Sequence, residues 1–528
     1  MAIPGRQSAA AAESRAAVGR DALLAPPPPK VSRRVLLRVA SVACGVQFGW
    51  ALQLSLLTPY VQELGIPHQF ASLVWLCGPL SGLLVQPFVG HMSDRCASSL
   101  GRRRPFIIGG ALSIAFSVLL IGYSADIGRI LGDRGGGETR YGAISVYLVG
   151  FWLLDVGNNT TQGPCRALLA DLTGDAEKSG FEESPGKDHR RTRVANAYFS
   201  LFMALGNILG FATGSFSHWY SIFPFNVTSA CSINCANLKS AFLLDVVLLL
   251  MTTCISVSSA KEIPLSSANK VMTSVEDSTA QSDNGHEAFL WELFGSCRYL
   301  TLPVWMVLIA TALTWLGWFP FTLFDTDWMG REIYKGDPDE GQMYQTGVRM
   351  GAIGLMLNSI VLGFTSVVLE KLCRKFGAGL IWGISNIIMF FCFLAMLIIS
   401  SLAKNIDYPP NGLPPSGLVI AALVIFTILG APLSVTYTIP YAMISARIEP
   451  LGLGQGLSMG ILNLAIVVPQ MVVSVGSGPL DQLFGGSNSP AFAVGAIAAF
   501  ASGLVAIVGL PPQSITIRAT TAVRRGQR

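Results

Sequence analysis

Residues 70–92 read FASLVWLCGPLSGLLVQPFVGHM and contain no Lys, Arg, Asp or Glu. A run of about twenty apolar residues is the length that a helix needs to cross the hydrocarbon core of a bilayer. In lipid the backbone must satisfy its own hydrogen bonds, so such a run indicates a spanning helix rather than a strand. This stretch therefore predicts an integral membrane protein.

Similar apolar runs recur along the whole chain. Of its 528 residues, 51% are hydrophobic and 13% are charged, whereas a soluble domain carries about 25% charged residues. Counting the runs that are long enough to span gives about twelve helices. They are expected at residues 35–61, 70–92, 105–124, 143–172, 194–219, 240–259, 302–324, 346–369, 378–402, 418–445, 453–475 and 490–510.

A polar stretch at residues 261–301 divides these spans six and six. Carriers built from two six-helix halves place their substrate near the bilayer midplane, between the halves. This division therefore favours an all-α membrane carrier over a channel or a receptor. The expected parts are a disordered tail at 1–34, an N-terminal half at 35–260, a central loop at 261–301, a C-terminal half at 302–510 and a second tail at 511–528.

The basic residues gather on the loops of one side. They lie before span one, after spans two, four and eight, and at the end of the chain. Because loops rich in Lys and Arg stay in the cytoplasm, both termini and the central loop are expected to be cytoplasmic. The net charge of +5 is too mild and too scattered for a nucleic-acid-binding surface.

The loop after span five is expected on the opposite side. It contains Asn226-Val227-Thr228, an N-glycosylation pattern for which a chance tripeptide is an equal alternative. Cys231 and Cys235 share this loop, and the sequence leaves open whether they form a disulfide.

Span four carries the most informative polar pattern. Spacings of i, i+3, i+4, i+7 and i+11 place five polar side chains on one face of a helix. These residues are Asp155, Asn158, Asn159, Gln162 and Arg166. An ionised Asp near the bilayer centre costs several kcal/mol unless it faces a cavity and finds partners. The stripe therefore predicts the wall of a polar pathway, in which Asp155 carries a proton and can donate to a sugar hydroxyl. A static buried polar network is the alternative.

The loop after span two predicts a gate. Asp94 and Arg95 follow the span directly, and Arg102 and Arg103 come a few residues later. Asp94 could hold a helix end or an Arg across the interface between the halves in one state and release it in the other. A basic loop that only sets the topology is the alternative.

A second charged group lies at the end of span seven. It consists of Asp325, Asp327, Arg331 and Glu332. These side chains could pair into an outer gate, or they could cap the helix and face solvent. His68, just before span two, could bond a hydroxyl or titrate, or it could be an ordinary loop histidine.

No motif indicates an enzyme. The sequence has no phosphate-binding Walker loop, so ATP-driven pumping has no support. No Ser-His-Asp arrangement or metal-ligand cluster stands out. Neither a cofactor nor a bound metal is therefore expected.

Several segments together resemble the plant sucrose–proton symporters, in the glycoside-pentoside-hexuronide branch of the major facilitator superfamily. They are residues 57–65 (LTPYVQELG) with His68, 93–105 (SDRCASSLGRRRP), 153–159 (LLDVGNN), 170–172 (ADL), 318–321 (WFPF) and 325–332 (DTDWMGRE). The resemblance implies a major facilitator fold and import of sucrose into the cytosol, driven by the proton gradient. Other glucosides are implied secondary substrates, and sucrose, protons and the lipid bilayer are the implied partners.

The resemblance also implies roles for single residues. The position of Asp155 matches the family's proton- and sugar-coupled carboxylate, and that of His68 matches a histidine linked to sucrose recognition. From the residue pattern of the stripe, and not from the resemblance, Asn158, Asn159 and Gln162 complete the expected sucrose site. Residues assigned to the gates and the charged network are Asp94, Arg95, Arg102, Arg103, Arg166, Asp171, Arg193, Asp325, Asp327, Arg331 and Glu332.

Some alternatives remain open at this point. A sugar sensor or an uncoupled facilitator would have the same fold as a symporter. The resemblance favours the plasma membrane, with the vacuolar membrane as the alternative, because vacuolar members carry the same motifs. A homo-oligomer is also possible.

Overall fold

The computed structural model describes most of the chain between its two tails. The described residues are 31–133, 139–174, 188–260, 262, 300–337, 342–408, 412–448, 455–484 and 487–510. Within these ranges the regular structure is helical, apart from one isolated β-bridge between Thr228 and Cys231. Most of the predicted tails and of the predicted central loop lies outside the described residues.

The spanning helices agree with the sequence prediction. In the described part, 10 helical runs are long and apolar enough to cross a membrane. Two further helices, α9 (Tyr141–Gly174) and α10 (Asp188–Ser215), are 34 and 28 residues long. The polar stripe lowers the hydropathy of α9, and α10 begins with charged residues. Both are nevertheless long enough to span, because a helix rises about 1.5 Å per residue.

The first group of spanning helices is built from residues 33–259. The first run combines α2 (Arg33–Ala40), α3 (Val42–Leu52), the π-helix η1 (Gln53–Leu57) and α4 (Thr58–Glu63). It is followed by α5 (His68–Val74), α6 (Cys77–Arg95), α7 (Arg104–Gly122), α9, α10 and α12 (Ile233–Ser259). Short connecting elements are α8 (Ser124–Ile130), α11 (Trp219–Ile222) and the 3-10 helix η3 (Pro224–Asn226).

The second group is built from residues 302–509. It contains α15 (Leu302–Trp328), which continues as the π-helix η5 (Met329–Ile333), then α16 (Gln342–Phe376) and α17 (Ala378–Asn405). The chain then forms α18 (Ser416–Ile448), α19 (Gln455–Leu483) and α20 (Ser489–Gly509).

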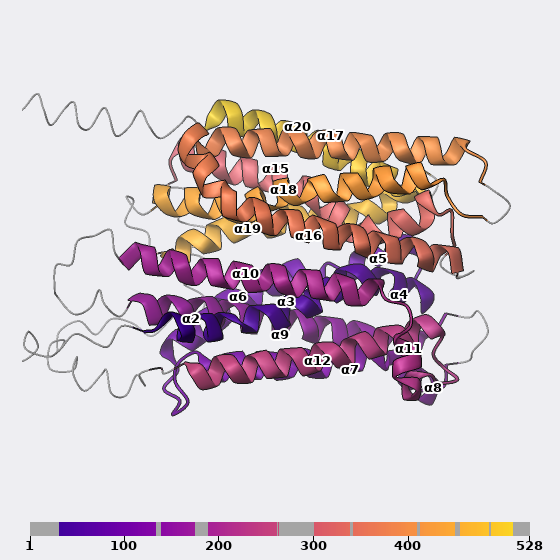
Figure 1. The fold of residues 1–528 in the computed structure, drawn as a ribbon, viewed down its shortest axis with the longest axis horizontal. Coiled ribbons are helices and arrows are strands. Elements are labelled where there is room, and N and C mark those ends of the chain that lie inside the picture. The colour runs from indigo at the N-terminus through magenta and orange to yellow at the C-terminus, as the bar shows by residue number, and fades with distance from the viewer. Residues whose placement is uncertain are drawn as a thin grey trace, which may run out of the picture.

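The two groups lie one above the other with their long helices roughly aligned (Figure 1). Within the first group α7 packs on α9 and α3 on α10, and within the second α17 packs on α20 and α16 on α18. Between the groups, α10 packs on α16, and α5 and α6 pack on α19. One end of the bundle carries α4, α8 and α11 (Figure 1). The sequence predicts that it faces outside, and we call it the outer end.

Small residues set the close approach of α10 to α3. A Cβ atom added at Gly206 would lie 2.4 Å from the carbonyl oxygen of Cys44, and one at Gly210 would lie 2.6 Å from that of Phe48. These distances are too short for any side chain. Helices in membranes associate largely through such contacts, since water does not drive apolar surfaces together there.

We expect Gly210→Val to separate α10 from α3 and to destabilise the protein, because the added carbons meet backbone that cannot move away. Overpacking of this kind costs about 1–3 kcal/mol. The check is the melting temperature of the purified protein in detergent, with Gly109→Val as the matched control, since a Cβ at Gly109 on α7 meets nothing within 4 Å. Equal melting temperatures for the two variants would contradict the packing argument.

The predicted outer loop after α10 packs tightly on the helices beneath it. Asn226 has an exposed fraction of 0%. Its Oδ1 accepts a hydrogen bond from the Tyr123 hydroxyl at 3.0 Å, and its Nδ2 donates to Ser240 Oγ at 2.9 Å. An N-linked glycan would need that same nitrogen. The packing is therefore incompatible with a glycan on Asn226, against the expectation from the tripeptide.

The same region holds a buried ion pair and a disulfide. The Lys239 ammonium, whose side chain is 0% exposed, pairs with Asp126 on α8 and lies 4.8 Å from the centre of the Tyr123 ring. Cys231 and Cys235 form a disulfide, with their Cα atoms 5.4 Å apart. The disulfide that the sequence left open is thus present, and it joins the loop to the first turn of α12.

Candidate functional site

The predicted stripe on α9 is buried at Asp155 and Asn158, partly buried at Asn159 and Gln162, and exposed at Arg166. Asp155 is 3% exposed, and its Oδ2 has no hydrogen-bond partner among the described residues. A Cβ added at Gly78 on α6 would lie 3.6 Å from that oxygen. The carboxyl group therefore faces α6 at a glycine, where it has space beside it.

Asn158 and Asn159 are neighbours in sequence but differ in their surroundings. Asn159 Nδ2 donates to Ser81 Oγ at 2.8 Å, and its Oδ1 accepts from Gln86 Nε2 at 2.7 Å, both on α6. Asn158 is 4% exposed, and neither polar atom of its side chain has a partner in the described part. Asp155 and Asn158 are therefore the members of the stripe with buried polar atoms that lack a partner in the described part, an arrangement that is costly unless something else bonds them.

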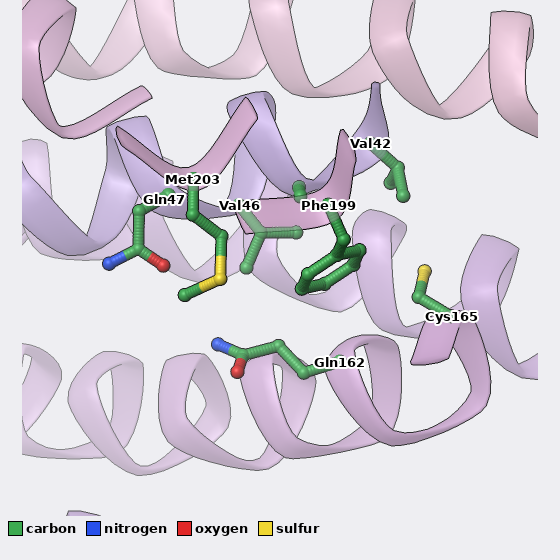
Figure 2. A pocket seen from close by; sticks show the side chains of 8 residues that line it. Val42, Val46, Gln47, Gln162, Cys165, Phe199 and Met203 are labelled. Atoms are coloured by element: carbon green, nitrogen blue, oxygen red, sulfur yellow. The ribbon is translucent and has the colours of Figure 1, made fainter. Parts of the chain in front are cut away.

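The far end of the stripe borders a small cavity between α3, α9 and α10. It has a volume of about 10 Å³, and Gln47, Gln162, Phe199 and Met203 are among the side chains that line it. Figure 2 shows the amide groups of Gln47 and Gln162 directed toward the same space. A cavity of about 10–15 Å³ has room for one water molecule. In this conformation it therefore cannot hold a sugar.

Arg166 is the last residue of the stripe, and it contacts two of the side chains that line this cavity. Its guanidinium lies 4.6 Å from the centre of the Phe199 ring, and its Nη2 donates to Met203 Sδ at 3.5 Å. These are contacts to α10. The structure therefore ties the cation of the stripe to a neighbouring helix of the same group.

The predicted outer charges form a network around Asp327. This carboxylate is 0% exposed. It accepts from Arg331 Nε at 3.1 Å, from the Tyr344 hydroxyl at 2.6 Å, from Asn488 Nδ2 at 2.9 Å and from Gln62 Nε2 at 3.3 Å. Gln62 belongs to the first group of helices and the others belong to the second. The network therefore joins the two groups at the outer end.

Glu332 accepts a separate set of hydrogen bonds at the outer end. Its Oε1 accepts from Ser487 Oγ and from the backbone N–H of Asn488, both at 2.8 Å, and its Oε2 accepts from Ser489 Oγ at 3.2 Å. Asp325, which is 2% exposed, accepts from the Thr326 backbone N–H at 2.6 Å. Of the four predicted outer charges, Asp327 and Arg331 thus pair with each other, whereas Asp325 and Glu332 bond neutral groups.

At the opposite end the structure brings Arg102 and Arg103 to Asp171. Arg102 Nη2 lies 2.7 Å and Arg103 Nε 3.1 Å from Asp171 Oδ2. Arg103 also donates to Ser93 Oγ at 2.5 Å, and its backbone N–H donates to Glu262 at 3.0 Å. These contacts stay within the first group of helices and fix α6, α7 and α9 to one another.

Four predicted residues can be placed only by their backbone. His68 begins α5, Asp94 and Arg95 end α6, and Arg193 lies in the first turns of α10. Their side chains lie outside what the structure describes. Their roles in sucrose recognition and gating therefore remain predictions.

Two further residues of interest were not predicted from the sequence. Gln62 gave no signal of its own, since a single Gln near a span end is ordinary. Asp245 on α12 is 0% exposed, neither of its oxygens has a hydrogen-bond partner among the described residues, and a Cβ added at Gly49 would lie 2.6 Å from Oδ2. A lone carboxylate inside an apolar span was the available signal for it.

In the described residues no group of three or more His, Cys, Asp or Glu side chains could hold a metal ion. The features that do stand out are helices of spanning length in two groups, a buried stripe of carboxyl and amide side chains, and a charged network between the groups. Together they define a multi-pass membrane carrier.

Known proteins place this carrier more closely. A family model described as Major Facilitator Superfamily matches residues 39–469. Sucrose transport protein SUT2 of Oryza sativa subsp. japonica is 69% identical over 506 residues, covering 94% of this chain and 96% of that protein. Sucrose transport protein SUC4 of Arabidopsis thaliana is 62% identical over 489 residues, covering 93% and 92%. The chain belongs to the sucrose transport proteins of the major facilitator superfamily.

The solved structures agree on the fold. A crystal structure of a D-xylose–proton symporter superposes with a TM-score of 0.55 at 12% identity, covering 91% of this chain and 99% of that one. Similarity at this level of identity concerns the fold alone. The major facilitator fold expected from the sequence is confirmed.

Proposed function

We propose that this protein imports sucrose into the cytosol together with protons, by alternating access. Its high identity to sucrose transport proteins supports the substrate. The observation that carries the proton coupling is Asp155, a carboxyl group buried at mid-helix whose Oδ2 has no partner among the described residues. Such a group is expensive to keep ionised in a membrane. It therefore favours taking up a proton and releasing it when water reaches it.

In the proposed cycle the neutral carboxyl of Asp155 donates a hydrogen bond to a sucrose hydroxyl. Asn158, whose amide also has no partner in the described part, offers a donor and an acceptor to further hydroxyls. Asn159 holds α6 against α9 and so keeps these groups in place. After the halves rock, water enters from the other side, the proton leaves Asp155, and the sugar loses its donor.

The hydrogen bonds between the two groups of helices support the proposal that this conformation is closed on its outer side. Hydrogen bonds between the two groups of helices are found at the outer end, from Gln62 to Asp327 and from Thr58 Oγ1 to the Leu323 carbonyl at 3.4 Å. A further bond, from Asn463 Nδ2 to the Gly82 carbonyl at 3.2 Å, joins α19 to α6. Sucrose and a proton would enter when the outer contacts open.

The proposed topology places both termini in the cytoplasm and the outer end outside. The disulfide between Cys231 and Cys235 supports this orientation, because disulfides persist in oxidising compartments and are rare in the cytosol. The plasma membrane is the proposed location, with the vacuolar membrane as the alternative. No cofactor is proposed, since the proton gradient supplies the energy.

We expect sucrose to evoke an inward current in cells that express the protein, and the current to grow when the outside pH falls from about 7.5 to about 5, which raises the proton concentration roughly 300-fold. The measurement is a voltage-clamp recording with surface expression verified. Uptake without current would instead indicate an uncoupled facilitator. Binding with neither uptake nor current would indicate a sensor.

A further inference from the structure

Gln62 lies where the two groups of helices meet at the outer end. It is 4% exposed and sits in the last turn of α4. Its Nε2 donates to Asp327 Oδ1 at 3.3 Å, and its Oε1 accepts from Arg331 Nη2 at 2.6 Å. One neutral side chain of the first group therefore bonds both members of an ion pair in the second.

The ion pair itself is complete without Gln62. Asp327 and Arg331 are four residues apart on α15 and η5, with Nε and Oδ1 at 3.1 Å. Tyr344 and Asn488 also donate to Asp327, at 2.6 Å and 2.9 Å, and both belong to the second group. If the groups separate, these four side chains stay together, and the two hydrogen bonds of Gln62 break.

The backbone on both sides of this contact is irregular. The π-helix η1, residues Gln53–Leu57, directly precedes α4, and the π-helix η5, residues Met329–Ile333, contains Arg331. Single π-turns inside α-helices are frequent at functional sites. Both halves of the contact therefore lie beside a local departure from regular helix, where the chain can change its direction.

We propose that Gln62 is the latch of the outer gate: its amide docks on the intact Asp327–Arg331 pair when the gate closes and leaves it when the gate opens. Among the described residues this movement separates no ion pair, so the Asp327–Arg331 pair stays intact, and breaking it would be more costly than exchanging an amide for water. The proposal rests on the proposed transport function and names the residue that controls its outer gate.

The test measures how fast a cysteine reacts when it is introduced at a buried position of α4, which the closed gate is expected to cover. Thr58 is 3% exposed on α4, so Thr58→Cys is expected to react slowly with a membrane-impermeant thiol reagent applied outside. Because this change also removes the Thr58–Leu323 bond, every rate is compared with that of Thr58→Cys alone. We expect Gln62→Leu, which keeps the volume and removes both bonds, to raise that rate about tenfold, since bonds to charged groups are the stronger class. Gln62→Met serves as a second apolar variant in case the first does not reach the surface.

The matched control is Gln342→Ala, an exposed amide on α16 in the second group, which should leave the rate unchanged. Parent cells without Thr58→Cys give the background from native cysteines. Wild-type rates in both Gln62 variants would overturn the latch, even where sucrose currents are normal. A raised rate in the Gln62 variants, together with no sucrose current from the wild-type protein, would support the latch and refute the proposed function instead.

Discussion

Asp155→Asn is expected to abolish uphill sucrose accumulation while leaving the protein folded. Asparagine has nearly the same shape and can still donate to a hydroxyl, but it cannot take up or release a proton. One proton moving down about 100 mV releases about 2.3 kcal/mol, which equals a roughly fifty-fold concentration ratio at about 1.4 kcal/mol per tenfold. The steady-state ratio of internal to external sucrose should therefore fall by at least this factor, to about one.

The measurement is accumulation of labelled sucrose in vesicles with an imposed pH gradient and potential, beside the sucrose-evoked current. Asp245→Asn is the matched control, since Asp245 is also a buried carboxyl without a hydrogen-bond partner in the described part, but it faces Gly49 in the packing between α12 and α3. The control should keep accumulation. If accumulation survives in Asp155→Asn, or is lost only in Asp245→Asn, the group that couples the proton does not lie on α9.

Downhill exchange separates the two roles proposed for Asp155. If the group both couples the proton and bonds the sugar, the Asn variant should still exchange internal for external sucrose, since its amide remains a donor beside Asn158. Loss of exchange together with accumulation would mean that the carboxyl is needed for sugar binding itself. The comparison uses the same vesicles without a gradient.

The sequence predicted those parts of the site that lie on one helix. Period and spacing suffice to place Asp155 and Asn158 on one face of α9, because helix geometry relates nearby positions directly. The apolar runs likewise predict the spanning helices, since the bilayer fixes their length. Hydropathy is a poor guide where function requires polar side chains. The polar stripe lowers the mean hydropathy of α9, so this helix is harder to recognise as a spanning helix than its neighbours.

Contacts between distant segments could not be predicted in this way. The bonds of Gln62 to Asp327 and Arg331 depend on how two groups of helices dock, and nothing in the local pattern around Gln62 encodes that docking. The same holds for Asp171, which the sequence assigned to the charged network without identifying Arg102 and Arg103 as its partners. Asn226 shows the same limit from the other direction: the tripeptide left glycosylation and chance as equal alternatives, and only the fold shows that the side chain is buried.

Asp327→Ala is expected to produce the largest loss of stability. The substitution removes the carboxylate that accepts from Arg331 Nε, Tyr344 and Asn488, and it leaves Arg331 with Gln62 Oε1 as its remaining acceptor among the described residues. Removing one partner of a fully buried ion pair costs about 3–5 kcal/mol, and the cost here lies toward the lower end because the Arg331 side chain is 25% exposed. The apparent melting temperature of the purified protein should therefore fall well below that of the wild type.

Asp407→Ala is the control for this loss, since Asp407 is exposed and lies next to Ile406, whose carbonyl accepts from Lys335 beyond η5. An exposed charge contributes about 0–1 kcal/mol, so this variant should melt like the wild type. Adding Arg331→Leu to Asp327→Ala should recover part of the stability, because it removes the orphaned cation. An unchanged melting temperature in Asp327→Ala, or no recovery in the double variant, would show that the outer end is held by packing rather than by the ion pair. In that case the Asp327–Arg331 pair would serve chiefly as the surface on which Gln62 closes.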